Sequence, residues 1–153
     1  MSKAPVALIG THKVTDFDCG DELMTDWLKR YALPFSRTGQ ARTYATCNHI
    51  AVAGYYSLAR GGIVQGATSD ASRIQITPVM VLGHLGVTQK HQGNGLGAGL
   101  LKDAVTRTQS VAQYFGIRAL LAHAMTEHSI SFLKHYGFVQ SPIQEHTYLL
   151  RVA

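Results

Sequence analysis

A glycine-rich segment between an apolar strand and a long amphipathic helix constrains this chain more than any other feature. The segment reads Gln92-Gly93-Asn94-Gly95-Leu96-Gly97. The preceding residues, 78–87, are apolar and partly β-branched, which is typical of a buried strand. After the segment, apolar residues recur up to Phe115 at the i, i+3, i+4 spacing of a helix that packs on a core. This strand–loop–helix unit predicts a mixed α/β fold.

The same segment predicts an anion site. The first amides of a helix have no intrahelical acceptor, and the positive end of the helix dipole lies beside them. Glycines allow a diphosphate to approach the main chain without meeting a Cβ atom. The sequence therefore predicts a cradle for a phosphorylated cofactor at residues 92–98.

Composition indicates one globular domain, expected to comprise residues 1–153. The chain is 46% hydrophobic and 15% charged, which excludes disordered and fibrous classes. No apolar run approaches the roughly 18 residues that a transmembrane helix requires, and the apolar part of the N-terminus is too short for a secretory signal. Cys19 and Cys47 form neither a disulfide framework nor a metal-type spacing. We therefore expect a cytoplasmic protein with reduced thiols.

Charge is unevenly distributed. Five of the nine acidic residues lie within residues 16–26, whereas from Trp27 onward twelve Lys and Arg face four acids, a net charge of +8. This excess favours a polyanionic partner such as nucleic acid or a phosphorylated cofactor, although ordinary solubility charge would look the same.

The hydrophobic pattern predicts a mixed α/β sheet with helices on both faces. The expected strands are residues 6–9, 42–47, 50–58, a strand that starts near Pro78, 119–123, 138–139 and 147–152. Three helices are expected. The first is capped by Asp21 and stopped by Pro34, and its inner face carries Leu23, Trp27, Leu28 and Tyr31. The second ends at Gly116, and the third begins at Thr126 or Ser129 and ends at Gly137. Gly61, Gly62 and residues 66–73 are expected in loops.

Two common nucleotide-binding motifs are excluded. A dinucleotide-binding Rossmann motif lies after the first strand with an acid about 20 residues further on, whereas here the loop lies past the middle of the chain and no acid lies near residue 115. The chain also has no Gly-Lys-Ser/Thr sequence for a nucleoside triphosphate.

The spacing Gln92-x-x-Gly95-x-Gly97 after a late apolar strand instead resembles motif A of the GNAT N-acetyltransferase superfamily. The segment 132–138, Phe-Leu-Lys-His-Tyr-Gly-Phe, resembles the closing helix of that family, usually Phe-Tyr-x-x-x-Gly-Phe. The resemblance implies the GNAT fold, with a mostly antiparallel sheet splayed at the cofactor strand, and acetyl-CoA as co-substrate. The residues implied to hold acetyl-CoA are Leu85, Gly86, Val87, Gln92, Gly93, Asn94, Gly95, Leu96, Gly97 and Ala98.

A narrower resemblance covers nearly the whole chain. Residues 17–20, 26–28, 41–44, 52–58, 118–120 and 147–151 are similar to the GNAT toxins of type II toxin–antitoxin modules, the TacT- and AtaT-like group. The resemblance implies acetylation of the free α-amine of aminoacyl-tRNA, which inhibits translation. It also implies a homodimer and neutralisation by a ribbon-helix-helix antitoxin. The residues do not indicate which aminoacyl-tRNA is acetylated.

The chain departs from the toxins at two positions. Leu133 occupies the place of the tyrosine taken as general acid, and Tyr136, one helical turn away, is the alternative proton donor; it is equally compatible with packing beneath Phe138. His84 stands where relatives commonly carry arginine. It is a candidate base, an RNA contact or a core histidine.

The cofactor strand, 78–87, has His84 as its only titratable side chain. An α-amine titrates at about 8 and a lysine at about 10.4, so a site without a carboxylate suits an α-amine. Gly83 and Gly86 predict a bulge or the close approach of another backbone in this strand; the alternative is that they relieve packing against a helix.

Candidate RNA phosphate contacts are Lys29, Arg30, Arg37, Arg42, Arg73 and Lys90. No metal is expected, because the eight histidines show no i, i+4 pair with a catalytic glutamate. Two other functions remain open: a GNAT that acetylates a protein N-terminus or a small amine, and a coenzyme A- and RNA-binding homologue that Leu133 has left without catalysis.

Overall fold

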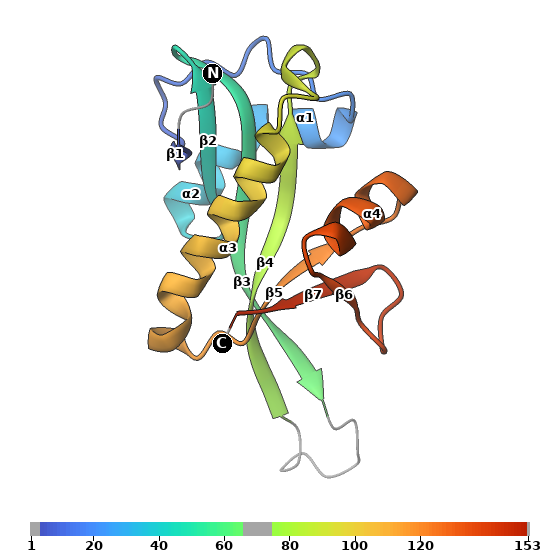
Figure 1. Cartoon of the computed structure of the whole chain (residues 1–153). Coiled ribbons are helices and arrows are strands. Elements are labelled where there is room, and N and C mark those ends of the chain that lie inside the picture. The colour runs from blue at the N-terminus through green and yellow to red at the C-terminus, as the bar shows by residue number, and fades with distance from the viewer. Residues whose placement is uncertain (1–3, 66–74, 153) are drawn as a thin grey trace. The chain divides into compact units, whose positions relative to one another are not determined.

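The computed structural model describes residues 4–65 and 75–152. The elements, in chain order, are β1 (Val6–Ala7), α1 (Glu22–Arg30), α2 (Ala32–Thr38), β2 (Arg42–Asn48), β3 (Ala51–Gln65), β4 (Gln75–Val87), the 3-10 turn η2 (Gln89–His91), α3 (Leu96–Phe115), β5 (Ala119–His123), α4 (Glu127–His135), β6 (Val139–Gln140) and β7 (Thr147–Arg151) (Figure 1). The strands follow the order β1-β2-β3-β4-β5-β7-β6. β4 and β5 are parallel, whereas β1–β2, β2–β3, β5–β7 and β6–β7 are antiparallel. The predicted mixed α/β class with a mostly antiparallel sheet is confirmed.

The chain divides into two compact units, Met1–Ala59 with Gly83–Thr106, and Arg60–Leu82 with Arg107–Ala153. In the first unit, α1 and α2 cover one face of the sheet and α3 covers the other (Figure 1). Phe17, Leu28, Ala32 and Tyr55 are among the buried residues that pack between α1, α2 and the sheet. The helices on both faces that the pattern predicts are therefore present.

Helix α1 begins as predicted, because the Asp21 side chain accepts a hydrogen bond from the Met24 amide at 3.1 Å. Two other predictions for this region are wrong. Leu23 lies outward, 84% exposed. Pro34 does not end a helix but lies in the first turn of α2, where its missing N–H removes no helical bond.

Strands β2 and β3 form the predicted hairpin, whose turn places His49 at φ +57°. β3 continues to Gln65, so the prediction of a loop at Gly61 and Gly62 is wrong. A Cβ atom on Gly61 would lie 2.8 Å from Val81 Cγ2, and one on Gly62 would lie 2.8 Å from Ile76 Cγ2. The glycines are needed because branched side chains of β4 fill the space.

In the second unit, β4 pairs with β5 from Val79↔Ala119 to Leu82↔Ala122, and β5 pairs along its length with β7. Helix α4 begins with a capping box in which the Thr126 side chain accepts from the Ser129 amide; Thr126, rather than Ser129, is thus the N-cap. Gly116 and Gly137 end α3 and α4 at φ +65° and +93°.

Across residues 4–65 and 75–152, no helix has the length and apolar character needed to cross a membrane.

Helix α3 packs directly on β3 in the first unit. A Cβ atom on Gly54 would lie 2.8 Å from Leu100 Cδ1 and 3.3 Å from the Gly86 carbonyl oxygen. Leu100 is 1% exposed and has little room to move. The Tyr56 hydroxyl donates to the Asp103 carboxylate, which adds a polar link between β3 and α3.

We therefore expect Gly54→Ala to lower the free energy of unfolding by about 1–3 kcal/mol through overpacking. Urea denaturation would measure the change. Gly10→Ala is the matched control, because a Cβ atom at Gly10 would meet nothing within 4 Å. Equal stability of the two variants would show that α3 is not seated on Gly54.

Candidate functional site

The loop between β4 and α3 adopts a conformation that depends on two glycines. Gly93 and Gly95 have φ angles of +83° and +80°, in the left-handed region that side chains disfavour. A Cβ atom at either position would meet no atom within 4 Å. These glycines are therefore required by the backbone conformation and leave the outer side of the loop open.

The amides of this loop are available to a ligand. Helix α3 begins at Leu96, so the amides of its first turn have no intrahelical acceptor. Within the described residues, no group accepts a hydrogen bond from the amides of residues 93–98. Clustered N–H donors at the positive end of a long helix fit the diphosphate of a nucleotide-derived cofactor.

Hydrogen bonds from Gln92 hold the loop in place. Its side-chain Nε2 donates to the Val87 carbonyl at 2.8 Å and to the Cys19 carbonyl at 3.1 Å. The Gln89 amide donates to the Asp18 carbonyl at 2.8 Å. The loop is thus joined to the end of β4 and to the segment before α1, and Gln92 shapes the loop through its side chain.

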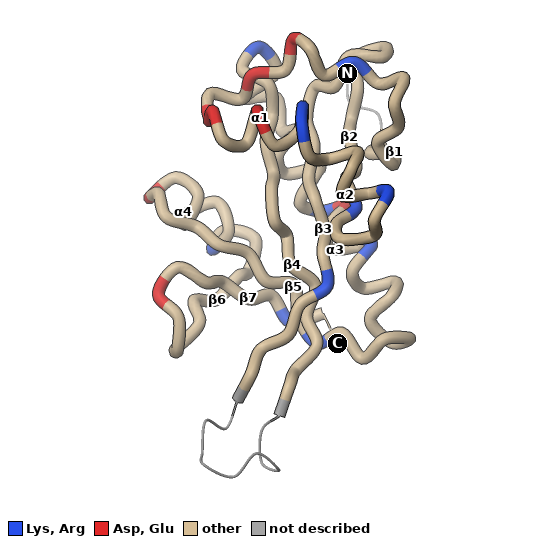
Figure 2. Tube along the Cα trace, turned by 180° about the vertical axis from the view of Figure 1, so that it is seen from behind, with Lys and Arg blue, Asp and Glu red and all other residues tan. Residues whose placement is uncertain are grey.

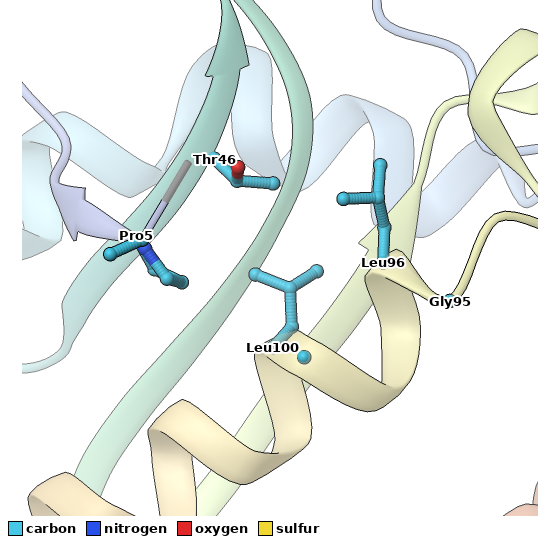
Figure 3. Close-up of a pocket in the computed structure, with 7 residues that line it drawn as sticks. Pro5, Thr46, Gly95, Leu96 and Leu100 are labelled. Atoms are coloured by element: carbon cyan, nitrogen blue, oxygen red, sulfur yellow. The ribbon is translucent and has the colours of Figure 1, made fainter. Parts of the chain in front are cut away.

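Two cavities of about 220 Å³ each flank the start of α3. In one of them, Leu96 and Leu100 project from α3 toward Thr46 of β2 and Pro5 (Figure 3). The other is more polar and includes His91 and Asn94. Thr46 and Leu96 line both cavities.

The end of β4 lies beneath α1. A Cβ atom on Gly86 would lie 2.9 Å from Met24 Sδ and 3.4 Å from Cys19 Sγ. The space beside Gly86 is therefore filled by side chains of α1 and its preceding segment. The alternative, that this glycine relieves packing against a helix, is confirmed for Gly86.

The backbone is irregular at Gly83 and His84. A Cβ atom on Gly83 would lie 3.0 Å from Ser57 Oγ, and His84 Nδ1 lies 2.9 Å from the same oxygen. Consecutive side chains of a regular strand point to opposite faces, so β4 departs from a regular pleat here. A β-bulge at these glycines stays a prediction.

His84 lies in an aromatic cluster with Trp27 and Tyr55. Its ring stacks on Trp27 with a centroid separation of 4.0 Å and an interplanar angle of 19°, and Tyr55 lies at 6.4 Å. Burial lowers the pKa of His84 below its ordinary value, and Asp21 opposes this shift. The imidazole is therefore neutral at pH 7, but it is only partly buried and so is not a simple core histidine.

Tyr55 has a structural part in this cluster. Its side chain is fully buried, and its hydroxyl donates to the Met24 carbonyl at 2.6 Å. Burial raises the pKa of Tyr55, and Cys19 and Asp21 add to the shift. Tyr55 therefore stays protonated and anchors α1 over the sheet.

In the second unit, the closing-helix residues separate into buried and exposed sets. Leu133 and Phe138 are buried, whereas Tyr136 ends α4 and is 43% exposed. The Tyr136 ring makes edge contacts with Phe132 at 5.2 Å and His135 at 4.8 Å. These contacts leave the ring partly open to solvent.

The candidate RNA contacts Lys29, Arg30, Arg37, Arg42 and Lys90 are all exposed in the first unit. Arg30 Nε lies 3.3 Å from Asp26 Oδ1, and this pair is solvent-exposed. Figure 2 shows acidic residues gathered around α1. Arg73 lies outside the described residues. Within those residues no group of three metal-ligating side chains occurs.

The fold and the glycine loop define the class of the protein: a GNAT-fold acetyltransferase. One solved structure with this fold, a Tyr-to-Phe mutant of AtaT bound to the C-terminus of the antitoxin AtaR and acetyl-CoA, has a TM-score of 0.83 and 26% identity, covering 97% of this chain and 92% of that one. Another, AtaT complexed with acetyl-methionyl-tRNAfMet, has a TM-score of 0.86 and 25% identity, covering 96% and 93%. No family model matches the chain.

A curated relative makes the identification more specific. The tRNA-acetylating toxin of Mycobacterium tuberculosis strain H37Rv is 34% identical over 142 residues, which cover 91% of this chain and 86% of the relative. This chain belongs to the family of tRNA-acetylating toxins.

Sequence reasoning missed two residues of the site. Ser57 has no local signal, because its partner His84 lies 27 residues away. Trp27 was expected only to line the inner face of a helix, and its spacing does not predict that it stacks on His84.

The neutral state of His84 predicts a pH-dependent stability. The folded protein binds this proton less readily than the unfolded chain, so acidification below the ordinary pKa of 6.5 favours unfolding. We expect the free energy of unfolding to fall between pH 7.5 and 5.5 by less in His84→Gln than in the wild type. The control is His128→Gln, at an exposed position of α4, which should retain the full decrease in the free energy of unfolding. An equal decrease in the wild type and both variants would contradict the inference that burial keeps His84 neutral. Urea denaturation at each pH measures it.

Proposed function

We propose that this chain transfers the acetyl group of acetyl-CoA to the α-amine of an aminoacyl-tRNA and so blocks the use of that tRNA in translation. The observation that carries the proposal is the row of unengaged amides at residues 93–98, at the start of α3. The relatives support it, since one is a tRNA-acetylating toxin and another was solved with an acetylated aminoacyl-tRNA.

In this proposal the loop binds the diphosphate of acetyl-CoA. The amides of Gly93, Asn94, Gly95, Leu96, Gly97 and Ala98 supply the donors, and Gln92 keeps the loop in shape. Leu85, Gly86 and Val87 lie beyond Leu82, the last residue of the β4–β5 ladder, and their main chain would pair with the pantetheine amides. This arrangement would hold the thioester beside β4.

The reaction needs an unprotonated amine and a proton for the departing thiolate. An α-amine with a pKa of about 8 is roughly one-tenth neutral at pH 7, whereas a lysine with a pKa of about 10.4 is less than about a thousandth neutral. The leaving thiolate requires an acid, and Leu133 has no proton to donate. The partly exposed Tyr136 is the proposed donor.

The partners of the proposal follow from the same relatives. The exposed basic residues Lys29, Arg30, Arg37, Arg42 and Lys90, with Arg73, would contact tRNA phosphates. A cognate antitoxin would neutralise the toxin, since AtaT was solved with its antitoxin AtaR, and we propose that this antitoxin is of the ribbon-helix-helix type. A homodimer acting in the cytoplasm completes the proposal.

The test is acetylation of charged tRNA by the purified protein, detected as N-acetylaminoacyl-tRNA by mass spectrometry. A higher kcat/KM for a peptidyl lysine, a protein N-terminus or a small amine would instead identify another acetyltransferase. Binding of acetyl-CoA and tRNA without any acetyl transfer would indicate a homologue that acts by binding alone.

The cradle can be tested separately. Gly95→Ala should lower the affinity for acetyl-CoA at least ~10-fold, because a left-handed φ is strained with a side chain and the loop amides would be displaced. Gly39→Ala is the matched control: Gly39 has φ +78°, also with nothing within 4 Å of a Cβ atom, but it ends α2. Calorimetric titration measures both, and equal losses would place the cofactor elsewhere.

Tyr136→Phe should lower kcat at least ~10-fold with little change in the KM for acetyl-CoA, as expected for loss of a general acid. Tyr114→Phe, at a tyrosine of α3 that is 75% exposed, serves as the control. A wild-type kcat in Tyr136→Phe would mean that the thiolate leaves without this hydroxyl.

A further inference from the structure

A continuous row of ring contacts joins the cofactor strand β4 to the surface of α1 and α2. His84 of β4 stacks on Trp27 at 4.0 Å, Trp27 meets the edge of Phe35 at 5.9 Å, and Phe35 meets Tyr31 at 6.2 Å. The Tyr31 amide donates to the Trp27 carbonyl and the Phe35 amide to the Tyr31 carbonyl, so helical spacing continues from α1 into α2. These four rings are called the aromatic row below.

Exposure increases toward the outer end of the aromatic row. His84, Trp27 and Phe35 are partly buried, whereas Tyr31 is 44% exposed. Phe35 meets Tyr31 at an interplanar angle of 67°, an edge contact that covers at most one face of the Tyr31 ring. Among the described residues, no other ring contacts Tyr31. The aromatic row therefore ends at the surface with an aromatic face that no other ring covers.

The segment that carries Tyr31 is basic. Residues 27–42 contain four Lys and Arg and no Asp or Glu. Lys29 lies in the last turn of α1 and Arg37 in the last turn of α2, and both are exposed. Within the part of the chain that the structure describes, neither makes a salt bridge. An open aromatic face among cations is the combination that binds single-stranded nucleic acid, because bases stack on the ring while cations contact the phosphates.

We propose that Tyr31 stacks on an unpaired base at the 3′ end of the tRNA, with Lys29 and Arg37 on the neighbouring phosphates. This inference rests on the proposed function and deepens it, since it names the residue that holds the tRNA by a base. The amino acid of an aminoacyl-tRNA is attached to an unpaired 3′ end, so the bases next to it are free to stack.

The aromatic row also relates this contact to the reaction. It begins at His84 on β4, the strand beside which the proposed function holds the thioester. Only Trp27 and Phe35 separate Tyr31 from His84 in the row, so a short single-stranded end can reach from Tyr31 to the cofactor strand. Because all tRNAs end in the same unpaired sequence, Tyr31 contributes affinity for the nucleic acid and not a choice among amino acids.

Stacking can be measured independently of acetylation, with deacylated tRNA that carries 2-aminopurine at each unpaired 3′ position in turn. The emission of this base falls when it stacks on a ring. At one position we expect the emission to fall when the tRNA binds the wild type or Tyr31→Phe, but not when it binds Tyr31→Leu, which keeps an apolar side chain against Phe35 without a ring. Phe115→Ala, at a 66% exposed aromatic of α3, should match the wild type. Unchanged emission at every position in the wild type would overturn the proposal.

Kinetics and salt dependence separate stacking from charge. Tyr31→Leu should raise the KM for aminoacyl-tRNA at least ~5-fold, by the same factor for tRNAs that carry different amino acids, with kcat and the KM for acetyl-CoA unchanged. Tyr31→Leu should leave the slope of log affinity against log salt unchanged, because stacking releases no counterion. Arg37→Gln should reduce the magnitude of that slope by about 0.7–1.

The outcomes distinguish this inference from the proposed function. A wild type that acetylates aminoacyl-tRNA, together with a Tyr31→Leu variant of unchanged affinity for tRNA, would leave the open face to a protein partner and overturn the inference alone. Equal losses in Tyr31→Leu and Tyr31→Phe would assign the contact to the hydroxyl and also overturn stacking. A wild type that shows the Tyr31-dependent fall in emission but acetylates no aminoacyl-tRNA would defeat the proposed function and retain Tyr31 as a nucleic-acid contact.

Discussion

The backbone of the β4–α3 loop depends on the two hydrogen bonds of the Gln92 side chain. They join the loop to the Val87 carbonyl at the end of β4 and to the Cys19 carbonyl ahead of α1. With these bonds in place, Gly93 and Gly95 adopt left-handed conformations, and no acceptor among residues 4–65 and 75–152 engages the first amides of α3. Main-chain donors that the fold holds in this way can bind an anion with little need of charged side chains.

The hydrogen bonds of Gln92 also connect the loop to the aromatic cluster of Trp27, Tyr55 and His84. The segment that accepts from Gln92 leads through the Asp21 cap into α1, which carries Met24 over Gly86 and Trp27 over His84. Tyr55 also fixes α1, by the bond from its hydroxyl to the Met24 carbonyl. A single helix thus positions both the main chain of the cofactor strand and the one titratable side chain on it, so displacement of α1 would disturb both.

Much of the fold follows from local signals. The glycine loop, the long helix that ends at Gly116 and the helix capped by Thr126 were predicted from spacing and capping, because these signals act within one or two turns. The predictions for Gly61, Gly62 and Pro34 were wrong because local signals did not decide where these residues lie. Glycines read as loop signals lie within β3, where Val81 and Ile76 fill the adjacent space, and a proline read as a stop signal lies in a first turn.

The chain's sequence alone determined the glycine loop between β4 and α3 and the absence of a carboxylate from residues 78–87, since both belong to contiguous residues. Only the tertiary structure decided that Ser57 meets His84, that Trp27 covers the ring and that Gly86 makes room for Met24. These contacts join residues 27 to 62 positions apart, and burial in the packed sheet, rather than any local preference, sets the protonation state of His84.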